Sequence, residues 1–182
     1  MRHGQTHDNL AHLIGGITDT PLTAKGEKQA RMAAKELQGL DFSYIAVSPM
    51  QRAFKTAQLA LPDLKLHIHG DLKERNWGDL EGHPTEELNN RFGCPCNGEH
   101  WDTFCQRVLS IVNELLNRHD KPLIVAHSGV YRVLCSAIGE DPGAAQIANG
   151  SIWYFSPEPA SPFWIKKVCK TMPYECCDCK SS

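Results

Sequence analysis

The sequence predicts an α/β protein with three layers, α/β/α, in which a mostly parallel central sheet lies between helices. Short apolar segments, as at residues 44–47 and 123–126, alternate with helical patterns along most of the chain. Such alternation is typical of parallel strands connected by helices. The length of 182 residues, with 41% hydrophobic and 22% charged residues, suits one domain with a sizeable core. We expect a single domain over residues 1–170 and a flexible, Cys-rich tail over residues 171–182.

The first part of the chain is predicted to hold a loop and one helix. Residues 7–22 contain Gly-Gly and Thr-Pro pairs, which favour a loop. Thr23 is a suitable N-cap, and apolar residues then recur at helical spacing until Gly39, which ends the helix.

A strand and a second helix are expected next. Residues 44–47 form a short apolar run, and Ser48 follows as the predicted N-cap of a helix, with Pro49 at its first position. This helix is expected to end near residue 61. Residues 65–69 alternate as a strand does, whereas residues 84–100 are rich in Gly and Pro and are predicted to be an insertion over one end of the sheet.

The second half of the chain is predicted to continue the alternation. Residues 101–116 present one apolar helical face, and Cys105 lies on it as a core residue. The remaining predicted elements are a buried strand at 123–126, a helix at 130–139 that contains the core residue Cys135, and two late strands at 151–155 and 163–168.

The beginning of the chain lacks an expected feature. Only Met1 precedes Arg2, although a reactive residue at the end of a central strand should follow several apolar residues. We therefore expect the native polypeptide to extend upstream of Met1 by a few apolar residues. They would form a first strand beside residues 44–47 and 123–126. Otherwise another segment, such as a late strand, must support His3.

Charge and cysteine content argue against several classes of protein. The net charge of −2 gives no reason to expect nucleic acid or a membrane surface as partner. No apolar run approaches the roughly 18 residues of a membrane span, and the polar N-terminus does not resemble a signal peptide. We expect a cytoplasmic protein, whose eight cysteines are thiols.

A cysteine-based metal or redox module remains an alternative for part of the chain. Its features would be the runs Cys94-Pro95-Cys96 and Cys176-Cys177-Asp178-Cys179. Zinc sites usually use Cys pairs two to four residues apart, which these runs do not match well. A thiol-rich tail is the better interpretation, and we expect no metal or cofactor.

Chemically active side chains gather at the predicted junctions between strands and helices. Arg2 and His3 stand at the first junction, Arg52 lies in the first turn of a helix, and His127 follows a buried strand. A further loop carries Glu74. The carboxyl ends of parallel strands meet at one edge of a sheet, so these groups would form an anion-binding pocket with the helix N-termini. Each residue alone fits a structural role better; their joint placement favours a site.

The residue types suit phosphoryl chemistry. A neutral imidazole is a nucleophile, and guanidinium groups match phosphate oxygens. Nearby arginines should lower the pKa of His3 and keep it neutral, and the carbonyl of Gly4 could fix its tautomer. Glu74 would be a normal general acid for an alkoxide leaving group.

The motifs of the chain resemble those of the histidine phosphatase superfamily, also called the phosphoglycerate mutase-like family. The resemblance covers roughly residues 1–155, in the family's order. It departs from the family in the missing residues of the first strand, the Cys-containing insertion around residues 93–98 and the tail after Cys169. The matching motifs are Arg2-His3-Gly4-Gln5-Thr6 with Asn9, Leu22-Thr23-Ala24-Lys25-Gly26 with Gln29-Ala30, Ser48-Pro49-Met50-Gln51-Arg52-Ala53 with Thr56-Ala57, Glu74-Arg75-Asn76-Trp77-Gly78-Asp79-Leu80-Glu81-Gly82, and Val125-Ala126-His127-Ser128-Gly129.

The resemblance implies a phosphoglycerate mutase-like fold and a role for each matching residue. His3 would attack phosphorus and become phosphohistidine. Glu74 would protonate the leaving oxygen and then activate water. Arg2, Arg52 and His127 would bind the phosphoryl oxygens. Secondary contacts to phosphate or substrate would come from Gln5, Thr6, Asn9 and Ser128.

We expect a phosphomonoesterase that acts on a small phosphorylated metabolite, as a monomer or homodimer. From Glu74 to His127 there are 53 positions (127 − 74). This short span looks more like the phosphatase branch, which includes α-ribazole-phosphate phosphatase-like proteins, than like phosphoglycerate mutases. Mutase-type phosphotransfer is the runner-up. A catalytically inactive binding protein is an alternative of another class.

Overall fold

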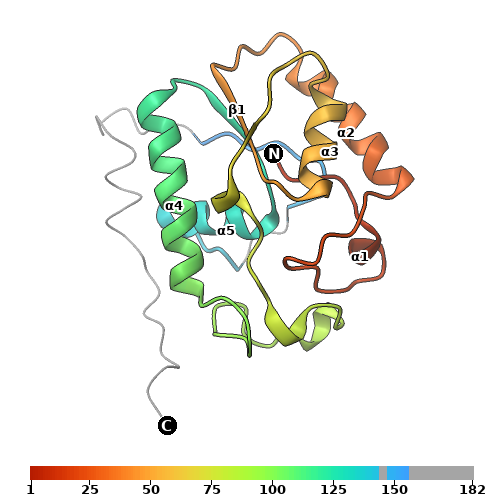
Figure 1. Cartoon of the computed structure of the whole chain (residues 1–182), viewed down its shortest axis with the longest axis vertical. Helices are drawn as coiled ribbons and strands as arrows, with labels where there is room; N and C mark the ends of the chain where they lie inside the picture. Colours follow the sequence, from red (N-terminus) through yellow and green to blue (C-terminus); the bar gives the residue numbers. More distant parts are fainter. Residues whose placement is uncertain (144–146, 156–182) are drawn as a thin grey trace.

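The computed structural model describes residues 1–143 and 147–155, which form three layers (Figure 1). The middle layer is a parallel sheet of the strands β1 (Tyr44–Val47), β2 (His67–Ile68) and β3 (Pro122–Val125). The strand order is β2-β1-β3, and both pairings are parallel. The predicted α/β fold with a parallel sheet is confirmed.

Two pairs of helices cover the two faces of the sheet (Figure 1). One pair is α2 (Ala24–Leu37) and α3 (Gln51–Ala60). The other pair is α4 (Trp101–Arg118) and α5 (Ser128–Ala137). Their positions agree with the helices predicted from the apolar periodicity.

Alternation along β1 divides the core between the two faces. Ala46 packs in the cluster formed with α4 and α5, whereas Ile45 and Val47 pack in the cluster formed with α2 and α3. Successive side chains of a strand point to opposite faces, so a four-residue apolar run serves both cores. Cys105 and Cys135 are buried thiols on the α4 and α5 side, as predicted.

Residues 1–3 extend the sheet beyond β3. Arg2 forms a parallel bridge with Ala126, and the N–H of His3 donates to the carbonyl of Ala126 at 3.0 Å. On its other side the segment hydrogen-bonds to residues 150–151 at 3.0 Å. The prediction that a first strand would lie beside residues 44–47 is wrong, because β1 is flanked by β2 and β3. His3 is therefore held between β3 and a late segment that is not itself a regular strand.

Of the two predicted N-caps, the one at Thr23 is confirmed and the one at Ser48 is wrong. The Thr23 hydroxyl accepts a hydrogen bond from the N–H of Gly26 at 3.1 Å and caps α2. The predicted cap at Ser48 is wrong, because α3 begins at Gln51 after a Met50 cap without a side-chain bond. Asp19 replaces it: its Oδ2 accepts from the N–H of Gln51 at 2.6 Å.

Other predicted elements differ in extent. Residues 7–22 hold a short helix, α1 (His7–Leu10), capped by Thr6. The strand at 65–69 shrinks to β2, and residues 151–155 are not a strand. Residues 84–100 lack an α-helix or strand and carry a 3-10 turn at Thr85–Glu87. The predicted strand at 163–168 and the Cys-rich tail lie outside the described residues.

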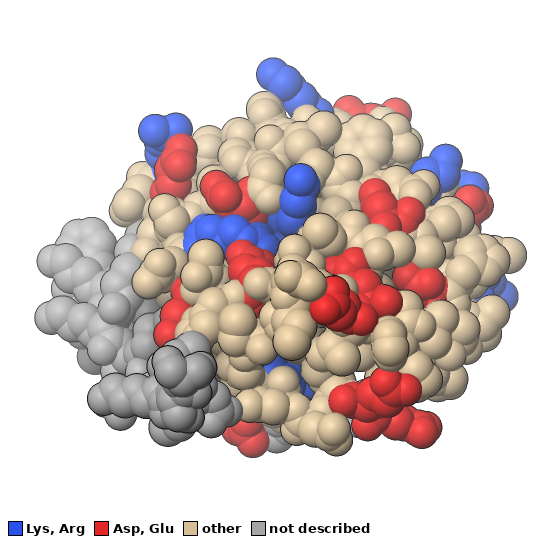
Figure 2. All heavy atoms as spheres, turned by 60° about the horizontal axis from the view of Figure 1, so that its bottom comes forward, with Lys and Arg blue, Asp and Glu red and all other residues tan. Residues whose placement is uncertain are grey.

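No helix in the described part of the chain combines the length and the apolar character needed to cross a bilayer. On the face shown in Figure 2, basic side chains are interspersed with acidic ones.

Candidate active site

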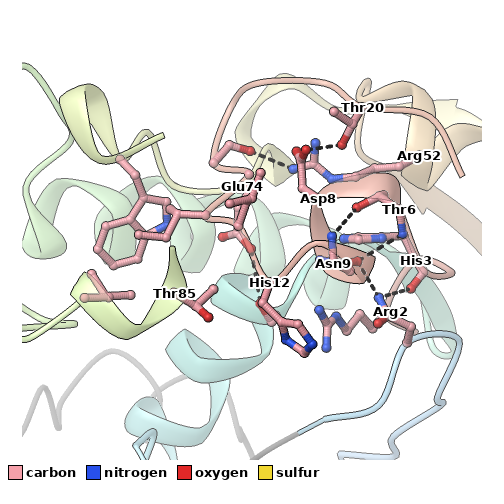
Figure 3. A pocket seen from close by; sticks show the side chains of 18 of the residues that line it. Arg2, His3, Thr6, Asp8, Asn9, His12, Thr20, Arg52, Glu74 and Thr85 are labelled. Carbon is pink, nitrogen blue, oxygen red and sulfur yellow. Dashed lines mark hydrogen bonds between the residues drawn. The ribbon is translucent and has the colours of Figure 1, made fainter. Parts of the chain in front are cut away.

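A cavity of about 400 Å³ gathers most of the predicted site residues (Figure 3). It is built from segments that follow the carboxyl ends of the strands, the edge at which parallel sheets bind ligands. Two predicted site residues, Gln5 and His127, do not line it directly. The predicted residues that do line it are Arg2, His3, Thr6, Asn9, Arg52, Glu74 and Ser128.

His3 is a buried imidazole with a defined tautomer. Its Nδ1 lies 2.7 Å from the carbonyl oxygen of Gly4, and its side chain is only 4% exposed. A carbonyl oxygen only accepts hydrogen bonds, so Nδ1 carries the proton and Nε2 keeps its lone pair. The predicted role of the Gly4 carbonyl is thus confirmed.

Gly4 also explains how the backbone beside His3 packs. A Cβ at Gly4 would lie 2.3 Å from the carbonyl oxygen of Gly26, so only glycine permits this approach to α2. The N–H of Gly4 donates to the hydroxyl of Thr56 at 3.0 Å. The nucleophile candidate is therefore braced from α2 and α3 at once.

His127 lies directly behind His3. The two ring centroids are 5.2 Å apart, and His127 is 2% exposed. Its Nε2 lies 2.7 Å from the hydroxyl of Ser48, which explains why Ser48 does not cap α3. The buried Nδ1 of His127 has no hydrogen-bond partner among the described residues.

The protonation of both histidines follows from their surroundings. Burial, and then the charges of Arg52 and Arg2, hold the pKa of His3 well below its usual value. Burial, Arg52 and His3 do the same for the pKa of His127. The predicted direction for His3 is confirmed, although burial and not the neighbouring arginines is the larger cause. Both rings are neutral at pH 7.

Two guanidinium groups reach the cavity from different elements. Arg2 donates to the carbonyl of Ile147 at 2.5 Å, and its buried Nε has no partner in the described part of the chain. Arg52, on the first turn of α3, donates to the carbonyl oxygens of Gly16 at 2.6 Å and Thr18 at 2.9 Å. Burial lowers the pKa of Arg2 to about 10, so it keeps its positive charge.

Glu74 sits against the N-terminus of α5. Its Oε2 accepts hydrogen bonds from the N–H of Gly129 at 3.0 Å and the Ser128 hydroxyl at 3.4 Å, and its Oε1 accepts from the N–H of Arg75 at 2.9 Å. The free N–H groups at a helix start thus hold the carboxyl group in place by hydrogen bonds. A Cβ at Gly129 would lie 2.0 Å from Oε1, so a side chain there would displace the Glu74 carboxylate from this position.

Polar residues of the N-terminal loop complete the cavity wall. Asn9 Oδ1 accepts from the N–H of Thr6 at 3.2 Å and from Asn149 Nδ2 at 2.9 Å. Asn149 also donates to the carbonyl oxygen of His3 at 3.2 Å. The side chain of Gln5 faces away, because its Oε1 accepts from the hydroxyl of Thr23 at 3.0 Å.

Sequence reasoning missed several residues of the cavity. His12 is one of them. The sequence around it gave no indication of a site, and its unusual backbone φ of 57°, in the left-handed region, is visible only in the structure. Asn149 lies far from the motifs in sequence and gave no signal. The other missed polar or charged residues that line the cavity are Asp8, Thr20, Thr85, Arg91 and Arg132.

The neutral histidines predict how stability depends on pH. Their pKa values are lowered on folding, so below about pH 6.5 the unfolded chain binds more protons than the folded one. We therefore expect the free energy of unfolding to decrease as the pH is lowered below about 6.5, by at most about 1.4 kcal/mol per pH unit for each histidine. Urea unfolding between pH 7 and pH 5 measures this. A His127→Asn variant should show a shallower slope, and an unchanged slope would contradict the assignment.

The fold and the site together define an α/β protein with a histidine- and arginine-lined anion pocket at the carboxyl edge of its sheet. The chain belongs to the histidine phosphatase superfamily (branch 1), which residues 1–166 match. The resemblance found in the motifs is thereby confirmed.

The relatives include both phosphatases and mutases. The chain is 37% identical over 150 residues to an uncharacterized phosphatase of Bacillus subtilis, PhoE, covering 78% of this chain and 77% of that one. It is 32% identical to a 2,3-bisphosphoglycerate-dependent phosphoglycerate mutase of Bartonella tribocorum, over 87% of this chain and 91% of the relative. The crystal structure of the alpha-ribazole phosphatase from Shigella flexneri superimposes with a TM-score of 0.72 at 31% identity, covering 82% and 85% of the two chains.

Proposed function

We propose that the protein is a phosphomonoesterase that hydrolyses a small phosphorylated metabolite through a phosphohistidine intermediate. The observation that carries this proposal is that His3 has a fixed, neutral tautomer beside two guanidinium groups. Its Nδ1 is bound to the Gly4 carbonyl, its pKa is lowered, and guanidinium groups of Arg2 and Arg52 share its cavity. A neutral nucleophile beside fixed cations suits attack on a phosphate ester.

The proposed reaction has two steps. In the first, His3 Nε2 forms a bond to phosphorus while the bond from phosphorus to the leaving oxygen breaks, and Glu74 in its protonated form gives that oxygen a proton. In the second, Glu74 takes a proton from water, the water oxygen attacks phosphorus, and the bond to His3 breaks. Arg2 and Arg52 stabilise the charge on the phosphoryl oxygens in both steps.

His127 can contact the phosphoryl group only when that group lies close to His3. Its ring lies behind His3 and does not line the cavity, but its Nδ1 lacks a partner. We propose that His127 contacts a phosphoryl oxygen once the group has moved onto His3. A buried polar atom without a partner is costly, which supports a ligand contact there.

The remainder of the cavity supports a leaving group of mixed character. Trp77 and Leu88 provide apolar wall, while Arg91 and Arg132 add two more guanidinium groups. A substrate whose alcohol carries a second negative charge would complement these arginines. Comparing phosphate esters of charged and neutral alcohols tests this selectivity.

Mutase-type phosphotransfer is the second candidate, because the relatives include mutases. The span of 53 positions between Glu74 and His127 favours the phosphatase. A panel of phosphorylated metabolites, assayed both for free inorganic phosphate and for positional isomers, separates the two. Isomer formation without phosphate release would favour the mutase. Absence of both products would favour a binding protein.

Hydrolysis is expected to continue without a metal ion. The proposed charge stabilisation comes from Arg2 and Arg52. Among the described residues, no group of three or more His, Cys, Asp or Glu side chains is placed to hold a metal. Phosphate release should therefore keep its rate, within about twofold, after EDTA treatment and desalting. Loss of activity that Mg²⁺ restores would contradict the proposed site.

A further inference from the structure

The carboxylate of Glu81 joins two loops of the candidate active site. Its Oε1 accepts hydrogen bonds from the N–H groups of Ile17 at 2.8 Å and Trp77 at 3.0 Å. Its Oε2 accepts from the N–H of Thr18 at 2.7 Å and from the Thr18 hydroxyl at 2.6 Å. Glu81 itself does not line the cavity. Four donors on one carboxylate fix the two loops relative to each other.

The loop that Glu81 binds is the loop that binds Arg52. The guanidinium of Arg52 donates to the carbonyl oxygens of Gly16 and Thr18, one on each side of the Ile17 N–H that Glu81 accepts. Gly16 also packs directly on the carboxylate. A Cβ there would lie 2.0 Å from Glu81 Oε1, and the φ of +52° lies in the left-handed region. Carboxylate, loop and guanidinium thus form one continuous series of contacts.

The position of Arg52 depends mainly on this loop. Arg52 is 4% exposed, and its third partner, Asp19, is at the longer distance of 3.4 Å and belongs to the same loop. Because backbone carbonyl oxygens hold the guanidinium, its position is fixed only as well as the backbone of this loop is fixed. Without Glu81, the N–H groups of Ile17 and Thr18 would lose their acceptor, and the loop would lose its fixed geometry.

We propose that Glu81 is a positioning residue for phosphoryl transfer, which holds Arg52 in place through residues 16–18. The inference rests on the proposed function, in which Arg52 stabilises the transferred group. Arg52 must meet charge that develops in the transition state, so a displaced guanidinium reduces kcat more than it raises KM. A misplacement of about 1 Å can cost about 100-fold in rate.

The first test replaces the carboxylate. Glu81→Gln keeps the size of the side chain, but it has one acceptor oxygen and turns an NH2 group toward N–H donors. We expect kcat/KM to fall by about 10- to 100-fold, mainly through kcat. Glu81→Asp keeps both oxygens and should lose less. Asp79→Asn is the matched control, because Asp79 stands on the 3-10 turn Gly78–Leu80 that directly precedes Glu81, and its carboxylate accepts from Asn97 at 3.0 Å, away from the cavity. It should stay within about twofold of wild type.

The second test asks whether Glu81 acts through Arg52. If it does, Glu81→Gln should change kcat/KM by less than about twofold in an Arg52→Ala background, because the group that it positions is absent. In a Glu74→Gln background it should keep its full effect. Equal losses in the wild-type and Arg52→Ala backgrounds would overturn the proposal, and so would coupling to Glu74 instead.

The design separates this inference from the proposed function. If the proposed function is wrong, wild type releases no phosphate or Arg52→Ala retains full activity. If only the inference is wrong, Arg52→Ala is impaired, and Glu81→Gln lowers kcat/KM by the same factor in the Arg52→Ala background as in wild type. Thermal melting of every variant shows whether it is folded at the assay temperature. Should Glu81→Gln fail this check, Glu81→Asp takes its place in the cycle with the same two outcomes.

Discussion

His3→Ala is expected to abolish turnover and to remove any phosphorylated form of the enzyme. The substitution deletes the nucleophile that the proposed reaction requires, while Arg2 and Arg52 stay in the cavity. Loss of a nucleophile costs roughly 10⁴- to 10⁶-fold in kcat where the remaining site still binds substrate. The measurement is phosphate release, together with trapping of a phosphoenzyme that is labile to acid and stable to base, as expected for phosphohistidine.

The control for this experiment is a histidine outside the cavity. His7 is exposed on α1 and does not line the cavity, so His7→Ala should retain activity within about twofold. Turnover of His3→Ala at the wild-type rate would place the nucleophile elsewhere. Loss of activity with a persistent phosphoenzyme would also contradict the assignment, because the phosphoryl group would then sit on another residue.

The parts of the fold that the sequence predicted well rest on local signals. The Thr23 cap and the apolar face of α4 are set by neighbouring residues, and both were found where expected. The residues at the ends of strands could be grouped before the structure, because parallel strands bring their carboxyl ends together. This principle placed Arg52 and Glu74 in one cavity with His3.

The errors arise where a distant contact replaces a local one. Ser48 has the sequence of a helix cap, but its hydroxyl lies next to His127, 79 positions away. Asp19 takes over at the start of α3, and nothing in the local pattern around Asp19 indicates this. A side chain has few hydrogen-bonding atoms, so a buried partner elsewhere can outweigh a local cap.

The contacts that hold His3 and Arg52 in place could not be predicted from the sequence either. Residues 1–3 are too short for a periodic pattern, yet they are paired on both sides, with β3 and with residues 150–151. Arg52 is held by backbone carbonyl oxygens, which every residue carries and which therefore leave no mark in the sequence. Such contacts become visible only when the chain path is known.

Arg52→Ala is expected to lose both activity and stability. The sequence alone placed this arginine in the predicted anion-binding pocket. In the structure its guanidinium is buried and satisfies the carbonyl oxygens of Gly16 and Thr18. Gly16 is buried, and its carbonyl oxygen left without a partner would cost about 1–3 kcal/mol. Removal of a preorganised charge donor costs about 3–4 kcal/mol of transition-state stabilisation, or about 10²- to 10³-fold in kcat/KM.

The two effects can be separated with a second variant and a control. Arg52→Lys keeps the charge but not the planar fork that serves two carbonyl oxygens and a phosphate together, so it should fall between wild type and Arg52→Ala in kcat/KM. Arg118→Ala removes a 70% exposed arginine of α4 that pairs with Glu114, and it should change neither activity nor melting temperature appreciably. If Arg52→Ala were destabilised yet fully active when folded, Arg52 would be a structural residue of loop 16–19. A large loss of kcat/KM at a temperature where the variant remains folded assigns it to the chemistry.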